Sequence, residues 1–418
     1  MAGFKKLGWI ALVAAGALGP ALGADGIPDA AERGDRVIAG SLVNTPPAPG
    51  DVSGPSGLVP KQKGQGPGQL RGIPKTAEEF SQRTMEIGEY VREFIKTSVV
   101  PGISLALAVG DEFTHFEGFG FSDLNSGRVV TPQTRFRIGS VSKTLTATAL
   151  GLLLEEGKLD LDADVRQYVP EFPDKGYRIT LRQLATHQSG LRHYRGNEVL
   201  NTRSYKNVLE SLKVFAADPL LAKPGTLHSY STYGYVLLSA AMERAAGLPF
   251  LTLMRDKVLM PLQMTQTEPE VEGRLLPGQA TGYEERGADG NAQVAPKSDL
   301  SPVWAGGGFV STAGDLLEFA RAYLNGRFLR QETLDLLWTP PTLGDGTKTR
   351  GGFGWQVART PGGRRLLVAG GNSIGGTTVM FIVPEEKVVL AFMTNMGNAP
   401  IRGVPANILG ILLGEEGE

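Results

Sequence analysis

The chain has 418 residues, of which 41% are hydrophobic and 20% charged, a composition typical of a globular protein with a sizeable core. Its 42 basic and 43 acidic side chains give a formal net charge of −1, so the charge favours neither nucleic acid nor an anionic membrane as partner. The absence of cysteine excludes thiol catalysis, thiolate metal sites and disulfides. Only four histidines occur, and no phosphate-binding or dinucleotide-binding glycine pattern is present, so we expect neither a metal nor a cofactor.

The N-terminus has the features of a secretory signal. Lys5 and Lys6 precede an apolar run at 7–22, which contains Pro20 and is followed by small residues. This run is shorter than the ~20 residues that a membrane span needs, and no other stretch approaches that length. We therefore predict a cleavable signal peptide at 1–23, a periplasmic or secreted protein, and no stable membrane span after cleavage.

A segment rich in proline, glycine and small polar residues follows, from residue 24 to residue 75. It shows no sustained apolar periodicity and cannot bury enough surface to fold, so we predict a disordered linker. The remainder, 76–418, is predicted to form one domain.

Hydrophobic periodicity predicts strands at both ends of this domain around a mainly helical middle. Helices are predicted at 77–97, 140–156 and 401–413, and strands at 103–109, 113–121, 354–358, 365–369, 377–383 and 388–394. Such an arrangement favours an α+β fold, in which one sheet domain carries a helical insertion.

The most informative motif is S-x-x-K at 140–143. In the predicted helix, Ser140 and Lys143 lie three positions apart on one face. A serine hydroxyl needs a nearby proton acceptor to become a nucleophile, and a desolvated lysine loses its charge more readily than an exposed one. The free N–H groups of a helix N-terminus would also suit a developing oxyanion. Taken alone, the spacing fits a simple helix cap at Ser140 equally well.

A second motif, Y-S-T at 230–232, makes the pattern specific. S-x-x-K followed about ninety residues later by Y-S-T resembles class C β-lactamases, penicillin-binding proteins of the D-aminopeptidase kind and related esterases. T-H-x-S-G at 186–190 and A-G-G-G at 305–308 occur in the order found in that family. The run S-G-L-R-H-Y at 189–194 is similar to the mitochondrial β-lactamase-like serine proteases and their bacterial relatives.

The resemblance implies a β-lactamase/transpeptidase-like fold, with an antiparallel sheet flanked by helices. It also implies that Ser140 is acylated while Lys143 and Tyr230 move protons to and from it, and that Tyr230 protonates the leaving group and later activates water. Thr232 stands where the family usually has asparagine. Its hydroxyl keeps a hydrogen-bonding group there but lacks the second group of the amide.

The family's third motif, K-T-G or H-x-G on a strand, corresponds here to Ala-Gly-Gly-Asn at 369–372. In this register Gly370 and Gly371 keep the backbone tight, and the N–H of Asn372 would complete an oxyanion hole with that of Ser140. Ala369 replaces the cation that would hold a substrate carboxylate.

We therefore predict a serine hydrolase for esters, amides or short peptides, with a small molecule or peptide as its partner. A genuine β-lactamase and a catalytically weak binding or assembling module remain as alternatives. The sequence does not give the oligomeric state.

Overall fold

The computed structural model describes residues 72–271, 274, 276–285, 291–326 and 328–415. The predicted signal peptide and most of the predicted linker, up to residue 71, lie outside these residues. The last linker residues, 72–75, lie against the domain: Pro74 is buried, and Arg83 donates a hydrogen bond to the carbonyl of Gly72.

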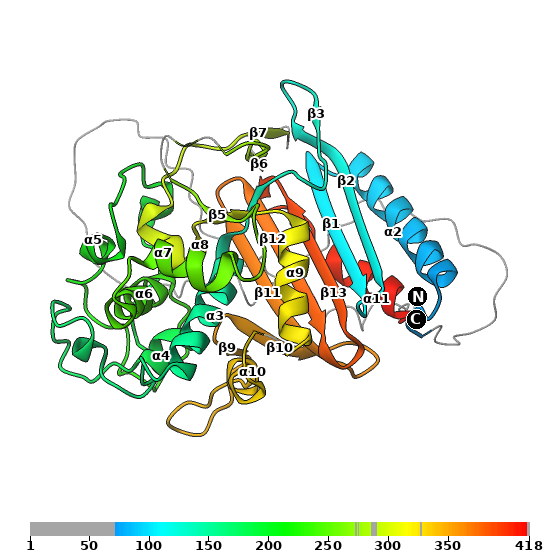
Figure 1. Ribbon diagram of the computed structural model, residues 1–418. Coiled ribbons are helices and arrows are strands. Elements are labelled where there is room, and N and C mark those ends of the chain that lie inside the picture. The colour runs from blue at the N-terminus through cyan, green and yellow to red at the C-terminus, as the bar shows by residue number, and fades with distance from the viewer. Residues whose placement is uncertain (1–71, 272–273, 275, 286–290, 327, 416–418) are drawn as a thin grey trace, which may run out of the picture.

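An eight-stranded antiparallel sheet forms the centre of the domain (Figure 1). Its strands, in spatial order, are β3 (Arg128–Val129), β2 (Phe113–Asp123), β1 (Gly102–Val109), β13 (Val388–Thr394), β12 (Gly376–Val383), β11 (Arg365–Ser373), β10 (Trp355–Arg359) and β9 (Gly351–Gly352). Strands from the two ends of the chain meet in the middle, where Ile103 of β1 lies opposite Thr394 of β13.

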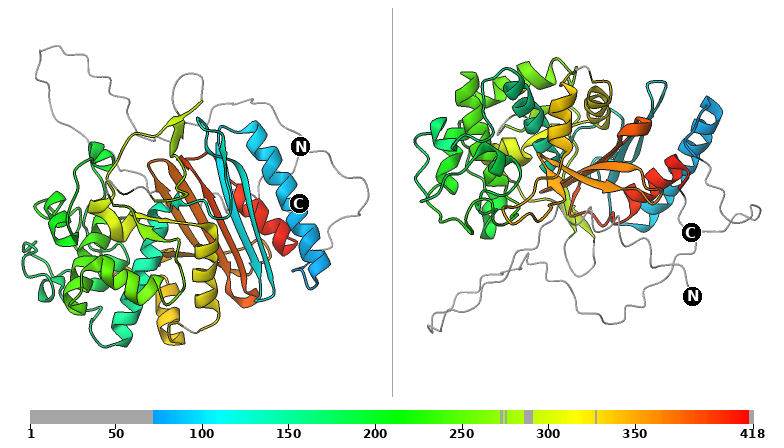
Figure 2. Two further views of the ribbon diagram at one scale, coloured as in Figure 1. Left: turned by 45° about the horizontal axis from the view of Figure 1, so that its top comes forward. Right: turned by 90° about the horizontal axis from the view of Figure 1, so that it is seen from below.

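One face of the sheet is covered by the helices from the two ends of the domain, α2 (Ala77–Thr97) and α11 (Val404–Leu413), as both views of Figure 2 show. Thr76 caps α2 in a reciprocal capping box with Glu79, which satisfies backbone donors at the helix start. Ile87 of α2 and Leu412 of α11 are fully buried in the core on this face.

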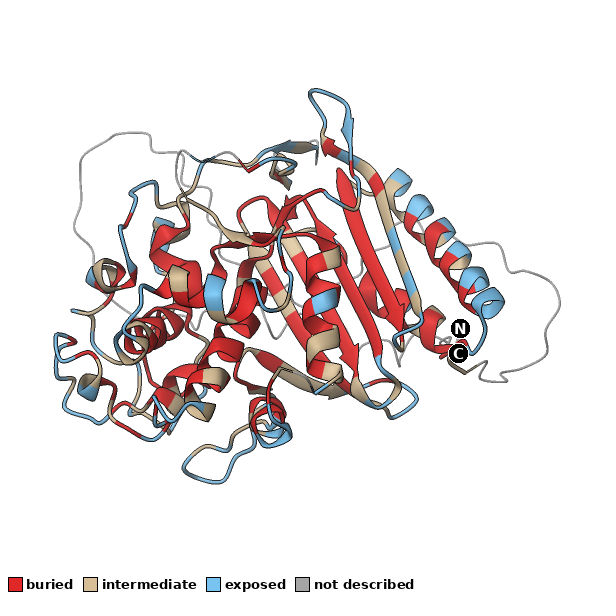
Figure 3. Ribbon diagram, viewed as in Figure 1, coloured by how far each residue is buried: buried red, intermediate tan, exposed pale blue. Residues whose placement is uncertain are grey.

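The opposite face carries α3 (Ser142–Glu155), α9 (Ala313–Leu324) and the helical region. That region and its surroundings contain α4 (Leu181–Ala185), α5 (Val208–Ser211), α6 (Thr232–Ala246), α7 (Phe250–Met254), α8 (Trp304–Gly307) and α10 (Gln331–Trp338). Short strands lie around it: β4 (Phe136–Arg137), β5 (Glu268–Pro269), β6 (Tyr283–Glu285), β7 (Ala292–Val294), β8 (Phe309–Ser311) and β14 (Met396–Gly397). Helix α3 is buried along most of its length, whereas α2 has one exposed face (Figure 3).

The predicted α+β class, with a helical insertion in a flanked antiparallel sheet, is confirmed. Two boundaries at the functional region differ from the prediction. The helix expected from residue 140 begins at Ser142, and residues 139–141 form a separate 3₁₀ turn. Strand β11 continues past Ala369 to Ser373, because its pairing with β12 holds Gly370 and Gly371 in the ladder despite their weak strand preference.

No single helix among the described residues is both long and apolar enough to cross a membrane. Helix α6 and the following segment, Phe250–Leu259, reach that length and composition only as a pair bent by 79°.

Candidate active site

Ser140 lies in a tight turn between strand β4 and helix α3. The turn, Gly139–Val141, is 3₁₀-helical, and Gly139 adopts a left-handed φ of +49° that favours glycine. The first N–H groups of such a turn have no partner within it and can face a ligand. Ser140 itself caps no helix, since Val141, the residue before α3, makes no side-chain capping bond and the turn has none either.

The side-chain nitrogen of Lys143 lies among three oxygen atoms. Nζ is 3.1 Å from Ser140 Oγ, 3.1 Å from Thr232 Oγ1 and 2.6 Å from the carbonyl oxygen of Gly306. Gly306 belongs to the last turn of α8, a helix of four residues, where a carbonyl lacks an intrahelical partner further along the chain. The three contacts fix the lysine side chain with its nitrogen pointing at the serine.

Burial lowers the pKa of Lys143 well below its ordinary value of 10.5, because the charged form loses its hydration. The side chain is 2% exposed, and the rings of Tyr230 and Tyr235 lie 4.8 Å and 5.5 Å from Nζ. Within the described part of the chain, no carboxylate forms an ion pair with it to counter this effect. Burial therefore favours the neutral amine, the form that can accept a proton.

Tyr230 also contacts the serine. Its hydroxyl donates a hydrogen bond of 2.6 Å to Ser140 Oγ. Burial raises the pKa of Tyr230 to about 12, although hydrogen bonds with Ser140 and Thr232 lower it in part. The phenol is therefore neutral at physiological pH and has a proton to give.

Strand β11 passes close to the serine turn. A Cβ atom on Gly371 would lie 2.0 Å from the carbonyl oxygen of Ile138 and 2.9 Å from the nitrogen of Ser140, so only glycine fits there. A Cβ on Gly139 would lie 2.8 Å from the nitrogen of Asn372. The backbones of the strand and the turn are thus in direct contact.

The side chain of Asn372 points away from the serine. Because side chains alternate along a strand, Asn372 lies on the face opposite Gly371. Its Nδ2 donates to Asn398 Oδ1 at 2.6 Å, and its Oδ1 accepts from the backbone N–H of Asn398 at 2.7 Å and from Thr377 Oγ1 at 3.1 Å. Only the backbone of Asn372 can therefore face the serine turn.

The structure thus brings Ser140, Lys143, Tyr230 and Thr232 into one hydrogen-bonded cluster. Gly371 and the backbone of Asn372 lie against it. Gly370 is the exception: it alternates to the other face of β11, opposite Val379 of β12, and serves the strand rather than the cluster.

Two features near the cluster are missing from the sequence interpretation. The first is the contact between the carbonyl of Gly306 and Lys143. The sequence analysis uses the glycine-rich run at 305–308 only as a family motif and predicts no such contact. His187 and His193, to which the sequence interpretation gives no role, have their rings 4.4 Å and 5.2 Å from the ring of Tyr230. The T-H-x-S-G motif includes His187, but sequence spacing alone does not predict that this histidine lies beside Tyr230.

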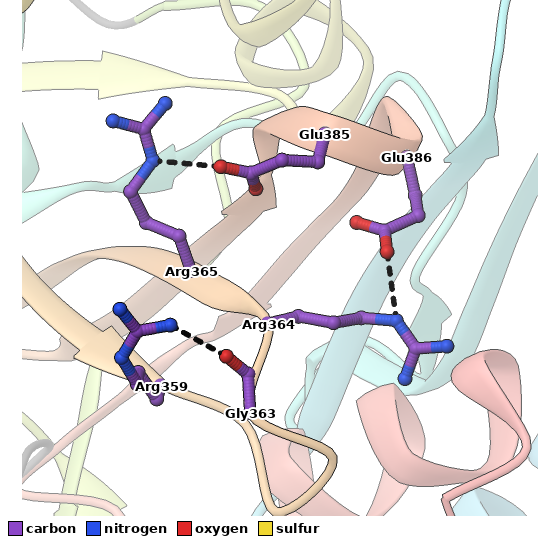
Figure 4. A pocket seen from close by; sticks show the side chains of 6 residues that line it. All are labelled: Arg359, Gly363, Arg364, Arg365, Glu385 and Glu386. Carbon is purple, nitrogen blue, oxygen red and sulfur yellow. Dashed lines mark hydrogen bonds and ion pairs between the residues drawn. The ribbon is translucent and has the colours of Figure 1, made fainter.

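A hollow at the end of β11 away from the serine turn is lined mainly by charged side chains (Figure 4). Arg364 Nε is 2.8 Å from Glu386 Oε1, and Arg365 Nε is 3.0 Å from Glu385 Oε1. Because these arginines are already paired with carboxylates, we assign the hollow a structural role at the hairpin.

Among the described residues, no group of three or more histidine, aspartate or glutamate side chains is placed to hold a metal ion.

The family model described as Beta-lactamase matches residues 87–410. The chain belongs to the β-lactamase family. Human "Serine beta-lactamase-like protein LACTB, mitochondrial" is 30% identical over 422 aligned residues, which cover 78% of this chain and 76% of the relative.

Two solved structures have a similar fold. An octameric penicillin-binding protein homologue from Pyrococcus abyssi has a TM-score of 0.70 and 26% identity, covering 80% of this chain and 78% of its own. The D-amino acid amidase from Ochrobactrum anthropi, complexed with D-phenylalanine, has a TM-score of 0.69 and 25% identity. The match covers 79% of this chain and 99% of the amidase chain. The chain is therefore a member of a serine-hydrolase family that includes penicillin-binding proteins and amidases.

Proposed function

We propose that the protein hydrolyses esters, amides or short peptides through an acyl-enzyme formed on Ser140. One observation carries the proposal: Ser140 Oγ lies 3.1 Å from the amine of Lys143 and 2.6 Å from the hydroxyl of Tyr230. A nucleophile, a desolvated amine and a neutral phenol are the groups that acyl transfer needs.

Lys143 is the proposed base for acylation. A neutral amine has two N–H groups and one lone pair. One N–H is donated to the carbonyl of Gly306, which can only accept a hydrogen bond, and the second N–H can be donated to the hydroxyl of Thr232. The lone pair is then left for the Ser140 proton. As Ser140 Oγ bonds to the substrate carbonyl carbon, that proton moves to Lys143, which becomes an ammonium ion.

Tyr230 is the proposed acid. When the tetrahedral intermediate collapses, the bond to the leaving group breaks and the phenol gives that group its proton. The Lys143 ammonium then returns a proton to the phenolate, so both groups regain their starting forms. In deacylation, water attacks the acyl carbon, a proton passes to the Lys143–Tyr230 pair, and Ser140 leaves with a proton.

The developing oxyanion requires backbone donors, and we assign this role to the N–H groups of Ser140 and Asn372. The contact between β11 and the serine turn supports the assignment, since Gly371 permits the two backbones to approach.

The substrate is proposed to be uncharged at the end that faces β11. Ala369 is 2% exposed and lies on the same face as Gly371, where it offers no positive charge to a carboxylate. The likeness to a D-amino acid amidase adds amino-acid amides to the candidate substrates, and the missing cation counts against efficient β-lactam hydrolysis.

A substrate panel tests the proposal. Wild type and Ser140→Ala are assayed with short-chain p-nitrophenyl esters, amino-acid p-nitroanilides of both configurations and a chromogenic cephalosporin. Turnover that disappears in Ser140→Ala supports the serine mechanism, and the preferred substrate identifies the class. Turnover that persists in the variant refutes Ser140 as nucleophile. If folded wild type turns over nothing, the binding-module alternative replaces the proposal.

We also propose that the protein is exported, because of the basic and apolar pattern at 1–23. Fractionation of expressing cells, with N-terminal sequencing of the mature protein, tests this. A full-length N-terminus in the cytoplasmic fraction would overturn it.

A further inference from the structure

Three of the chain's four histidines gather around Tyr230. The ring of His187 lies 4.4 Å from the Tyr230 ring at a tilt of 39°, and the ring of His193 meets it edge-on at 5.2 Å. His228 lies edge-on to His187 at 5.9 Å. Hydrolysis as proposed above uses none of these rings.

His187 binds the chain on both sides of Tyr230. Its carbonyl accepts the N–H of Ser229 at 2.8 Å, and its Nδ1 accepts the N–H of Ser231 at 3.2 Å. To make both contacts His187 adopts a left-handed φ of +59°, an unfavourable conformation for a residue with a side chain. The surrounding structure therefore holds His187 in place at a cost in backbone strain.

His193 makes the next contact along the same segment. Its Nδ1 accepts the N–H of Thr232 at 3.3 Å, so two consecutive peptide N–H groups after Tyr230 are each bound by a histidine ring. These N–H groups lie at the start of α6, where the first donors have no partner within the helix.

Both rings must be neutral to do this. A ring that accepts at Nδ1 carries its proton on Nε2 and has no acceptor once it is protonated. Burial is the main cause that lowers the pKa of His193 to about 3 and that of His187 well below its ordinary value. The neutral form therefore persists throughout the physiological pH range.

We infer that His187 and His193 are positioning residues for Tyr230: through Nδ1 they fix the peptide that follows it, and through their rings they hold the phenol against Ser140. The inference rests on the proposed function, in which Tyr230 delivers the proton to the leaving group. A phenol free to rotate would spend part of its time beyond the 2.6 Å contact with Ser140 and deliver that proton less often.

Two substitutions at each position distinguish the contribution of the aromatic ring from that of the Nδ1 acceptor. His187→Phe and His193→Phe keep an aromatic ring but lose Nδ1. His187→Asn and His193→Asn keep an acceptor near the Nδ1 position but lose the ring. His115→Phe is the matched control, since the fourth histidine lies on β2, where it contacts Glu117 at 3.1 Å.

The readout is the ratio of kcat/KM for a p-nitroanilide to kcat/KM for a p-nitrophenyl ester with the same acyl group. kcat/KM reports the steps up to acylation. In those steps an aniline must be protonated to leave, whereas p-nitrophenolate leaves without help, so only the anilide depends on a proton from Tyr230. We expect both Phe variants and Tyr230→Phe to lower this ratio by roughly 10-fold or more, with partial recovery in the Asn variants and no change in His115→Phe.

An equal loss for both substrates in the Phe variants, with a selective loss in Tyr230→Phe, would overturn the positioning role while leaving the proposed function intact. A Tyr230→Phe variant with an unchanged ratio would overturn both the acid role and the inference. The proposed function itself fails only if Ser140→Ala retains turnover or if the wild type has none. A crystal structure of His193→Phe gives a test independent of turnover: Tyr230 must have left hydrogen-bonding distance of Ser140, and an unmoved phenol refutes the inference.

Discussion

Replacement of Gly371 by alanine places one methyl group at the contact between β11 and the serine turn. The new Cβ would lie 2.0 Å from the carbonyl oxygen of Ile138 and 2.9 Å from the nitrogens of Ser140 and Val141. All three neighbours are backbone atoms, so no side chain can rotate to relieve the overlap. The strand and the turn must separate.

The size of this separation determines how much activity the variant loses. A carbon–oxygen contact of 2.0 Å must lengthen by at least about 1 Å to become tolerable, and a misplacement of that size costs roughly 10²-fold in a reaction that depends on alignment. If the Asn372 N–H also leaves the oxyanion, the loss reaches roughly 10²–10³-fold in kcat. Overpacking should lower the stability by about 1–3 kcal/mol.

Ester hydrolysis and thermal unfolding of Gly371→Ala are compared with those of Gly314→Ala. Gly314 lies in α9, where a Cβ would meet Phe116 and Thr312 at an ordinary 3.7 Å, so that alanine should be neutral or slightly stabilising. We expect a loss of kcat/KM of about 10²-fold or more in Gly371→Ala alone. A folded Gly371→Ala protein with wild-type kcat/KM would refute the assignment of this backbone contact to the active site.

Three further predictions follow from the same contacts. Thr232→Val removes one acceptor of Lys143 and should lower kcat/KM by roughly 5- to 150-fold, the equivalent of about 1–3 kcal/mol, whereas Thr232→Ser should retain activity. The pH profile of kcat/KM should rise as Lys143 loses its proton, at a pH well below 10.5, and should not fall again before about pH 12, where Tyr230 ionises; a descending limb near pH 10 would contradict this. Glu415→Gln weakens the buried link to Arg364 and Thr360 and should cost about 1–3 kcal/mol in chemical denaturation with kcat unchanged; an unaltered midpoint would contradict it.

Local pattern predicted much of the fold because the relevant forces are local. Helix α2 has an apolar face with helical spacing and a capping box at Thr76, and its observed bounds match the predicted range. The sequence pattern starts α3 two residues too early, because the left-handed turn at Gly139 depends on the approach of Asn372, more than two hundred residues later in the sequence. A contact between residues so far apart in the sequence cannot be predicted from local residue spacing.

The site shows the same division. S-x-x-K on a helix face leads to Ser140 and Lys143, and resemblance supplies Tyr230, which the structure places 2.6 Å from the serine. Gly306 and His193 could not be assigned this way, because each acts through a tertiary contact made by its carbonyl or its ring. A lone histidine in a loop has no distinguishing local pattern.

The central claim is an acyl intermediate on Ser140, and trapping it tests that claim most directly. Wild type, Ser140→Ala and Lys143→Met are mixed with p-nitrophenyl acetate, quenched in acid within the first turnovers and analysed by intact-mass and peptide mass spectrometry. The account predicts one added acetyl group in the wild type, located on Ser140, with none in Ser140→Ala and much slower labelling in Lys143→Met. Hydrolysis without any labelled serine, or a label on another residue that survives in Ser140→Ala, would contradict it.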